Sequence, residues 1–101
     1  MIKIELTLNK NGRGYFLLKE AEETLGEMEI GILENQLTVF HTEVIPKAEG
    51  KGIAKKLLKE MVDYSRGNNL KVRALCPFVR AQFNRHPEEY SDIIKKQKSV
   101  N

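Results

Sequence analysis

Residues 46–54 read Pro46-Lys47-Ala48-Glu49-Gly50-Lys51-Gly52-Ile53-Ala54. The residues before them alternate between apolar and polar as in a strand, and those after them repeat with the period of a helix, so the two glycines stand at a strand-to-helix junction. Glycine lets the backbone approach a ligand closely, and the first N–H groups of a helix have no internal partner. Such groups favour an anion, usually phosphate. The pattern also suits a turn that merely requires flexible residues.

The chain before this junction predicts four strands joined by short turns. The expected strands are residues 2–8, 15–18, 25–33 and 37–45. Asn35 is expected to take a positive φ in the turn before the fourth strand. Val39 and Phe40 are adjacent and both apolar, which indicates a strand covered on both faces. Short turns between consecutive strands predict an antiparallel meander.

An amphipathic helix follows the glycines and runs to about Arg66, with Gly67 as its stop signal. Its apolar stripe consists of Ile53, Ala54, Leu57, Leu58, Met61 and Val62. A fifth strand at residues 70–75 comes next. Because a helix separates it from the fourth strand, these two strands should be parallel, which gives an α/β fold with a mixed sheet.

A second helix is expected to begin at Cys76-Pro77, with the cysteine at the cap and the proline in the first turn. Pro87 should end this helix by about Arg85, because the residue before a proline is pushed out of helical geometry. One further turn or two is expected over residues 88–94. The predicted order is therefore four strands, a helix, a strand and a helix.

Length and composition limit what the chain can be. With 101 residues, 41% of them hydrophobic, it fits one domain, which we expect to span residues 1–95 with a frayed tail at 96–101. The formal net charge is only +3, with five lysines from Lys47 to Lys59. This local bias could attract an anionic ligand, but it falls short of a nucleic-acid-binding stripe, so no nucleic acid partner is expected.

The cysteine count and the N-terminus indicate the compartment. One cysteine excludes an internal disulfide and fits a reducing compartment. The alternating N-terminus has no continuous apolar run, so neither a signal peptide nor a membrane span is expected. We therefore expect a soluble cytoplasmic protein that is a monomer or a weak homodimer.

Three residues are candidates for chemistry. Cys76 at a helix start would have its thiolate favoured by the helix dipole, although a lone cysteine is as readily a small buried hydrophobe. His41 and His86 could carry protons near neutral pH, and each could equally serve packing or a bend in the chain. Neither histidine has partners at metal-ligand spacing, so no metal site is expected.

Spacing excludes two common phosphate-binding loops at the glycines. The chain has no G-x-x-x-x-G-K-[ST] segment, and a G-x-G-x-x-G fingerprint would need glycine where Lys55 stands. The site is therefore neither a P-loop nor a dinucleotide-binding turn. A phosphate site at one strand-to-helix junction and a thiol at the next suggest a cofactor with a phosphate end and a thiol end.

Together these segments resemble the GNAT acetyltransferases, and in particular their smallest branch, the small N-acetyltransferase-domain proteins. Residues 47–52 are similar to the acetyl-CoA signature [RQ]-x-x-G-x-[GA], with Lys47 in place of the arginine or glutamine. The other segments that carry the resemblance are His41-Thr42-Glu43-Val44, Leu57-Leu58, Cys76-Pro77-Phe78-Val79 and Arg85-His86-Pro87-Glu88-Glu89-Tyr90.

The resemblance implies that the fourth and fifth strands splay apart and that the pantetheine arm of acetyl-CoA lies in the gap. It implies pantetheine contacts from Thr42, Val44 and Ile45, with Phe78 beside the cofactor and the thioester near Cys76. The residues implied to hold the pyrophosphate are Glu49, Gly50, Lys51, Gly52, Ile53 and Ala54.

The chain departs from this family at two aromatic positions. Relatives often carry tyrosine where this chain has Phe78 and Phe83. Phenylalanine has no proton to donate, so Tyr90, His86 or water would have to protonate the departing thiolate.

The sequence thus predicts an acetyl-CoA-dependent N-acetyltransferase that acts on an amine, either a protein or peptide lysine or a small amine. Transfer would proceed by direct attack of the amine on the thioester, with His41 or Glu43 as base, or through Cys76. Two other classes stay open at this point. They are a CoA-binding module with little or no turnover and a small basic nucleic-acid-binding domain.

Overall fold

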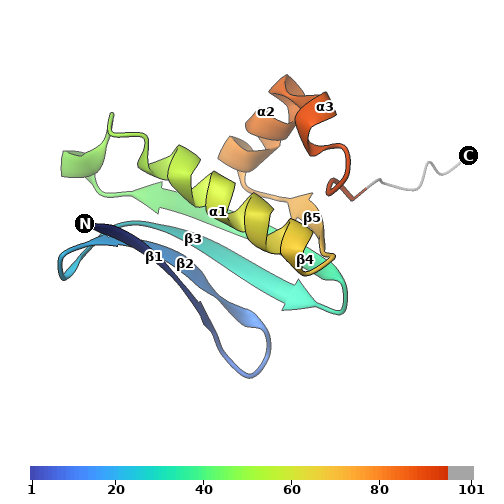
Figure 1. The fold of residues 1–101 in the computed structure, drawn as a ribbon, viewed down its shortest axis with the longest axis horizontal. Coiled ribbons are helices and arrows are strands. Elements are labelled where there is room, and N and C mark those ends of the chain that lie inside the picture. Colours follow the sequence, from blue (N-terminus) through green and yellow to red (C-terminus); the bar gives the residue numbers. More distant parts are fainter. Residues whose placement is uncertain (96–101) are drawn as a thin grey trace, which may run out of the picture.

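The computed structural model of the protein describes residues 1–95 and shows one five-stranded sheet with helices packed against it (Figure 1). The strands are β1 (Ile2–Leu8), β2 (Arg13–Glu20), β3 (Glu23–Leu33), β4 (Gln36–Val44) and β5 (Lys71–Ala74). The helices are the short 3₁₀ helix η1 (Pro46–Ala48), α1 (Ile53–Gly67), α2 (Pro77–Arg85) and α3 (Pro87–Tyr90). The predicted strands and helices are confirmed, with ends shifted by a few residues.

The strands lie in the order β1-β2-β3-β4-β5. The first three pairings are antiparallel, and β4 pairs with β5 in parallel through the crossover helix α1. Figure 1 shows α1 lying along the sheet, with α2 and α3 beyond it near β5. This arrangement confirms the predicted mixed sheet.

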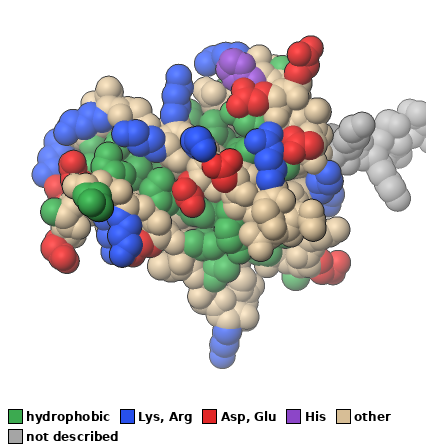
Figure 2. Space-filling model, viewed as in Figure 1, with side chains coloured by type: hydrophobic (Ala, Val, Ile, Leu, Met, Phe, Trp, Pro, Cys, Tyr) green, Lys and Arg blue, Asp and Glu red, His purple; other side chains and the backbone are tan. Residues whose placement is uncertain are grey.

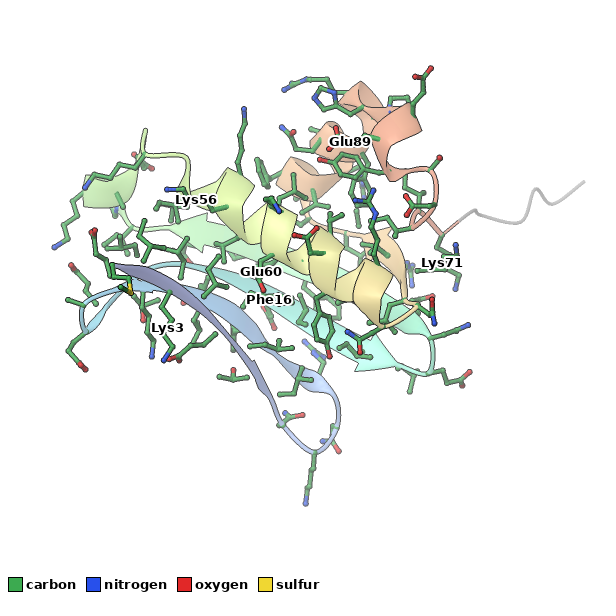
Figure 3. All side chains as sticks on the ribbon, in the orientation of Figure 1. Lys3, Phe16, Lys56, Glu60, Lys71 and Glu89 are labelled. Atoms are coloured by element: carbon green, nitrogen blue, oxygen red, sulfur yellow. The ribbon has the colours of Figure 1, made fainter. Side chains whose placement is uncertain are left out.

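The hydrophobic core lies between α1 and one face of the sheet. α1 contributes Leu57 and Met61, both fully buried, and β2 contributes Phe16. The ring of Phe16 meets that of Tyr64 of α1 edge to face, with 5.7 Å between the ring centres, and Figure 3 shows Phe16 between helix and sheet. Burial of one such side chain stabilises the fold by about 1.5–3 kcal/mol. The apolar stripe of α1 therefore accounts for its docking on the sheet.

The start of α1 lies close to β3 because Gly26 has no side chain. A Cβ on Gly26 would lie 2.7 Å from Cγ2 of Ile53 and 3.2 Å from the carbonyl oxygen of Glu43. Ile53 is the first residue of α1 and is buried. The glycine therefore sets how near the N-terminus of α1 comes to the sheet.

A β-bulge interrupts β4 at Phe40. The register with β3 skips one residue between Val39 and His41, so Phe40 is the extra residue. Val39 is fully buried, whereas Phe40 is half-buried and lies beneath Arg13, whose guanidinium carbon is 4.2 Å from the ring centre. Val39 therefore faces the core, whereas Phe40 lies on the opposite face of the sheet, which Arg13 covers in part.

Two turns are made by non-glycine residues with a positive φ, and in the first of them it is not the residue predicted. Between β3 and β4 the φ of 55° belongs to Glu34 rather than Asn35, because a two-residue hairpin can require the left-handed conformation at its first turn residue. After α1, Gly67 is still helical, and Asn69 has the positive φ of 55°. Asparagine adopts this conformation more readily than most residues because its side chain bonds the local backbone.

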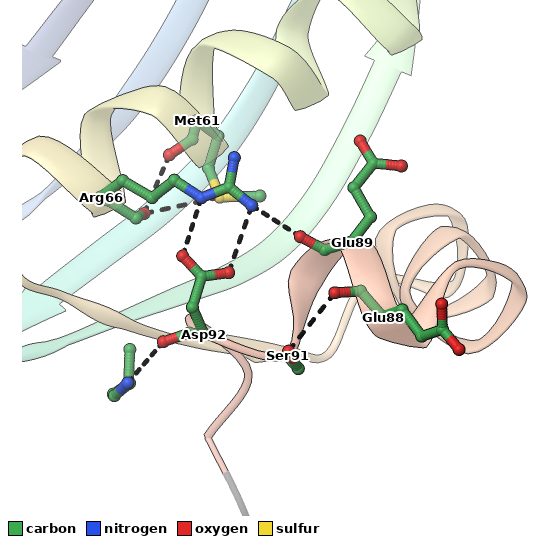
Figure 4. Close-up of polar contacts among 8 residues, drawn as sticks. Met61, Arg66, Glu88, Glu89, Ser91 and Asp92 are labelled. Carbon is green, nitrogen blue, oxygen red and sulfur yellow. Dashed lines mark hydrogen bonds and ion pairs between the residues drawn. The ribbon is translucent and has the colours of Figure 1, made fainter.

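Polar contacts hold the chain after α3 to α1 and β5 (Figure 4). The Arg66 guanidinium donates to both carboxylate oxygens of Asp92, at 2.9 and 3.2 Å, and to the carbonyl oxygen of Glu89 at 2.6 Å. Val72 of β5 donates its N–H to the carbonyl oxygen of Ile93 at 2.6 Å. The last described residues therefore run beside β5. The predicted frayed tail, residues 96–101, lies outside the described residues.

Charged side chains of both signs are interleaved over the face shown in Figure 2. Many form exposed pairs, such as Lys3 with Glu5 at 3.2 Å and Lys59 with Asp63 at 2.8 Å. Exposed pairs of this kind each contribute little to stability. No helix in residues 1–95 is long and apolar enough to cross a membrane.

We predict that the pairing of Arg66 with Asp92 makes the C-terminal segment sensitive to acid. The hydrogen bond from Arg66 holds the pKa of the Asp92 carboxyl below its ordinary value of 3.8. The pair therefore stabilises the folded segment above pH 3.8, and this contribution is lost as the pH falls through the lower folded-state pKa. In an Asp92→Asn variant, the Val72 amide should exchange its hydrogen faster at pH 6, and the difference from the natural protein should vanish under acid.

Asp63→Asn is the matched control. The Asp63 side chain is 54% exposed and the Asp92 side chain 56%, but Asp63 pairs within α1 and does not touch the C-terminal segment. Its replacement should leave the Val72 amide unchanged. Equal exchange in the two variants at pH 6 would show that the pair with Arg66 does not hold this segment.

Candidate functional site

β5 is shorter than β4, and the two strands part at Val39. Their parallel register ends with Val39 opposite Ala74. The carbonyl oxygen of Val39 then accepts two successive amides, from Leu75 at 3.0 Å and from Cys76 at 3.1 Å. β4 continues to Val44, while the chain after β5 turns into α2. Within residues 1–95 no strand pairs with this edge of β4 beyond Val39, so the strands splay as predicted.

The open edge of β4 presents backbone polar groups. The N–H of Ile45 bonds the carbonyl oxygen of Leu25 on the β3 side, at 3.0 Å. Successive residues of a strand turn their backbone groups to opposite sides, so Val44 and Thr42 direct theirs to the edge that β5 leaves open. An extended ligand with amide groups can bond to such an edge.

The two glycines adopt left-handed conformations at the start of α1. φ is +85° at Gly50 and +75° at Gly52, the N-cap of α1. A Cβ on either glycine would meet nothing within 4 Å, so the space beside them is open. The first helical hydrogen bond runs from the N–H of Lys56 to the carbonyl oxygen of Gly52, and no side chain caps the helix. The N–H groups of residues 53–55 therefore lack a helical acceptor.

The surroundings of these donors are positively charged. The first turn of α1 has no acidic residue and carries exposed Lys55 and Lys56, of which Lys56 is labelled in Figure 3. Lysines at this end oppose the helix dipole, so they disfavour the empty helix start and favour a bound anion. Lys47 is engaged elsewhere, because its ammonium lies 2.7 Å from the Glu23 carboxylate. The groups that could contact an anion here are therefore the backbone N–H groups and the lysines of α1.

Cys76 lies where β4 and β5 part and is the N-cap of α2, as predicted. Its side chain is 2% exposed, and its thiol donates a hydrogen bond to the hydroxyl oxygen of Thr42 at 3.3 Å. The structure thus brings the candidate nucleophile together with one predicted cofactor contact. Phe78, in the first turn of α2, is half-buried and packs against the core.

The structure separates the two histidines from Cys76. Thr42 faces α1, and side chains alternate along a strand, so His41 points to the opposite face, where its Nε2 lies 3.7 Å from the Glu43 carboxylate. His86 is exposed between α2 and α3, about 15 Å along the helix from Cys76. No three His, Cys, Asp or Glu side chains within residues 1–95 are grouped to hold a metal ion.

Tyr90, one of the proton donors considered, lies in the core. It is 7% exposed, and its ring centre is 4.9 Å from that of Phe83. Burial raises the pKa of the Tyr90 phenol, and the nearby Glu89 carboxylate raises it further. A higher pKa makes the phenol a weaker acid, so the arrangement suits packing of α3 on α2 better than proton donation.

Two features of the site escaped prediction from the sequence. The contact between Cys76 and Thr42 joins residues 34 positions apart and depends on β4 extending beyond the end of β5. The second is the bulge at Phe40, which shifts the alternation along β4 by one residue and so turns to the open edge the backbone groups of Thr42 and Val44, two of the residues that the resemblance implied.

Comparison with known families assigns the class of this protein. The parting parallel strands and the open helix start belong to an N-acetyltransferase domain, and the model of the GCN5-related N-acetyl-transferase family matches residues 14–93. This match covers most of the chain, and the protein belongs to that family. A search of curated proteins found no match.

Solved structures share the fold. A GCN5-like protein from Staphylococcus aureus is 28% identical, with a TM-score of 0.64 over 96% of this chain and 93% of that one. A ribosomal-protein-alanine N-acetyltransferase from Brucella melitensis biovar Abortus 2308 is 18% identical, with a TM-score of 0.63 over 91% and 68%. The ribosomal-protein-S18-alanine N-acetyltransferase from Escherichia coli is 15% identical, with a TM-score of 0.61 over 65% and 43%. These last two show a common fold alone, and the chain spans less than half of the E. coli enzyme.

We expect glycine-to-alanine changes at the two ends of α1 to act in opposite directions on stability. Gly52→Ala places a side chain on a left-handed residue, which costs about 1–2 kcal/mol. Gly67→Ala changes a helical residue with open space around it, where alanine is favoured over glycine by about 0.5–1 kcal/mol. Denaturant unfolding measures both free energies. Equal stability of the two variants would contradict the need for glycine at the start of α1.

Proposed function

We propose that the protein is an acetyl-CoA-dependent N-acetyltransferase whose acceptor is an amine, either a lysine of a protein or peptide or a small amine. The observation that supports this best is the open edge of β4. The Val44 end of this edge leads to the unpaired N–H groups at the start of α1, and Cys76 lies at the Val39 end of the edge. A ligand along this edge would have its anionic end at α1 and its thiol end at Cys76.

The residues present fit coenzyme A. Thr42 and Val44 would bond the pantetheine amides through their outward backbone groups, with Phe78 beside the cofactor. Ile45 has both backbone groups engaged, its N–H with Leu25 and its carbonyl with the N–H of Ala48, so it would contribute its half-buried side chain. The segment proposed to hold the phosphates is Glu49, Gly50, Lys51, Gly52, Ile53 and Ala54.

Cys76 is the proposed catalytic residue, and its contact with Thr42 defines what it can do. Bound acetyl-CoA would supply an acyl group activated as a thioester. A hydroxyl both donates and accepts hydrogen bonds, so Thr42 can accept from the Cys76 thiol and can donate to a thiolate. Thr42 therefore supports either protonation state of Cys76.

The acceptor amine needs a base, because only the unprotonated amine is a nucleophile. His41 and Glu43 are exposed side by side on the face of the sheet opposite Cys76, so they would serve an amine that approaches from that face. A catalytic role for His86 also stays a prediction. Its backbone N–H bonds Gln82, which gives it a structural part in the bend between α2 and α3.

A CoA-binding module with little or no turnover is the second candidate. Within residues 1–95, the hydrogen-bond partner of the Cys76 thiol is a hydroxyl and not a base. The elements proposed to bind the cofactor are present all the same. A module that binds CoA without turnover would need only these elements.

Thermal unfolding with CoA, acetyl-CoA and longer acyl-CoAs tests cofactor binding. A ligand at 100 times its Kd stabilises a protein by about 2.7 kcal/mol, so CoA and acetyl-CoA should raise the Tm. Gly52→Ala should reduce this rise, because the added side chain intrudes on the proposed phosphate site, and Gly67→Ala should not. No rise with any acyl-CoA would refute the proposal. A rise without thiol release on a panel of amines would identify a binding module.

Replacement of Cys76 tests its catalytic part. Cys76→Ala should lower kcat by about 100-fold or more, because a positioned nucleophile or proton carrier is lost. The rise in Tm with CoA should persist, which separates catalysis from binding and from folding. Cys76→Ser, which keeps a donor to Thr42, is the conservative comparison. Full turnover of Cys76→Ala at saturating acetyl-CoA would exclude the thiol and leave direct attack by the amine.

A further inference from the structure

A cavity of about 670 Å³ lies on the outer side of β5, away from the open edge of β4. β5, α2 and the chain after α3 line it, and these elements adjoin one another in Figure 1. We call it the outer cavity. Its apolar lining comes from Val72, Ala74, Leu75, Phe83 and Ile94, and Leu75 is 39% exposed. Its volume is typical of sites for small ligands.

The charged side chains that line the outer cavity all have the same sign. They are Arg73, Arg80 and Lys95, and no Asp or Glu lines the cavity. Arg13 and Arg66 each pair with a carboxylate, whereas within residues 1–95 neither Arg73 nor Arg80 does. Like charges around one cavity repel each other, and a bound anion would relieve that repulsion.

β5 adds a backbone donor to these cations. The N–H of Val72 points outward to the carbonyl oxygen of Ile93. Because backbone groups of a strand point the same way at every second residue, the N–H of Ala74 also points outward. Ala74 lines the cavity, so its N–H is directed into it. No acceptor for it occurs in residues 1–95. The Ala74 carbonyl accepts a hydrogen bond from Nε of Arg80 at 3.4 Å, which keeps the guanidinium at the cavity.

We propose that the outer cavity binds the carboxylate of the acceptor, and that the acceptor joins a carboxylate to an apolar group and an amine. A guanidinium group matches a carboxylate with two parallel hydrogen bonds, and the Ala74 N–H offers a further donor. The apolar lining accommodates the adjoining hydrocarbon. A free apolar amino acid and a peptide that ends in an apolar residue present the same carboxylate chemistry.

The position of the outer cavity fits an acceptor site. Leu75 lines the cavity, and Cys76 follows it directly in the chain. A peptide with its C-terminal carboxylate in the cavity would extend a lysine amine around the end of β5 to the place where the strands part, whereas a free amino acid would hold its amine beside the carboxylate. The assignment of the ligand as acceptor rests on the proposed acetyl transfer, whereas binding of the carboxylate does not.

Titrations without CoA, followed by the backbone amide resonances of Ala74 and Leu75, test the inference. The probes are leucine and leucinamide, which differ only in the carboxylate, and the peptide Ala-Lys-Ala-Leu with a free or an amidated C-terminus. We expect saturable shifts with the free acids and at least about tenfold weaker binding of the amides, since a hydrogen bond to a charged group contributes about 1.5–3 kcal/mol. Whichever of the two free acids, leucine or the peptide, binds more tightly shows whether the carboxylate comes from a free amino acid or from a peptide C-terminus.

Arginine variants localise the binding. Arg73→Gln combined with Arg80→Gln should weaken the binding of the free acids by at least about tenfold, as expected for the loss of charged donors. Arg85→Gln is the matched control, because Arg85 is exposed on the same helix and does not line the cavity. An unchanged Tm rise with CoA would show that the double variant is folded.

The outcomes separate this inference from the proposed function. Equal binding of acids and amides, or acid binding that the double variant retains, would overturn the carboxylate site. Carboxylate binding in a protein that no acyl-CoA stabilises would refute the acetyl transfer but leave the carboxylate site in place. If the double variant raises KM for carboxylate-bearing amines and leaves kcat unchanged, the bound molecule is the acceptor.

Discussion

The carbonyl oxygen of Val39 accepts hydrogen bonds from two successive amides, those of Leu75 and Cys76. Two donors on one acceptor end the parallel ladder at this point, and the chain after β5 turns into α2 instead of continuing along β4. Had β5 run on, its amides would have paired with the rest of β4, and Cys76 would lie within a strand. The open edge of β4 and the position of Cys76 at a helix start are therefore two results of one constraint.

The open edge leads through η1 to the start of α1. In α1, one part of the helix stabilises the fold and another offers groups for binding. The apolar stripe of α1, with Leu57 and Met61 fully buried, anchors it to the sheet. Its N-terminus has a left-handed glycine, no cap and no acidic residue. Uncapped N–H groups cost stability in a free helix, and the buried stripe offsets that cost. The donors at the helix start thereby stay available to an anion.

β5 is short, yet it has a different neighbour on each edge. Its inner edge pairs with β4 up to Val39, and its outer edge pairs with the chain after α3 at Ile93 and then borders the outer cavity beside Ala74. The proposed cofactor site along the open edge of β4 and the proposed acceptor site in the outer cavity are thus separated by the width of one strand. Both end at the place where β5 stops, next to Cys76. In a small domain, one short strand can in this way border both an open strand edge and a cavity.

Local patterns in the sequence determined the secondary structure and its order. The alternation over residues 2–8 and the apolar stripe of α1 each reflect the geometry of a single element, and Pro77 and Pro87 fix helix boundaries through their own covalent structure. The glycines at 50 and 52 marked the helix start because few other residues adopt a positive φ. The parallel pairing of β4 with β5 followed from the helix between them.

Only the tertiary structure decided which of these elements meet and where their groups point. The bulge at Phe40 sets which backbone groups face the open edge, the contact of Cys76 with Thr42 spans distant parts of the chain, and His41 lies on the other face of the sheet. The sequence determined that a glycine-rich helix start and a cysteine stand at two strand-to-helix junctions. The structure placed them at the two ends of one open edge, because that placement depends on where β5 stops pairing with β4, which is a property of two strands together.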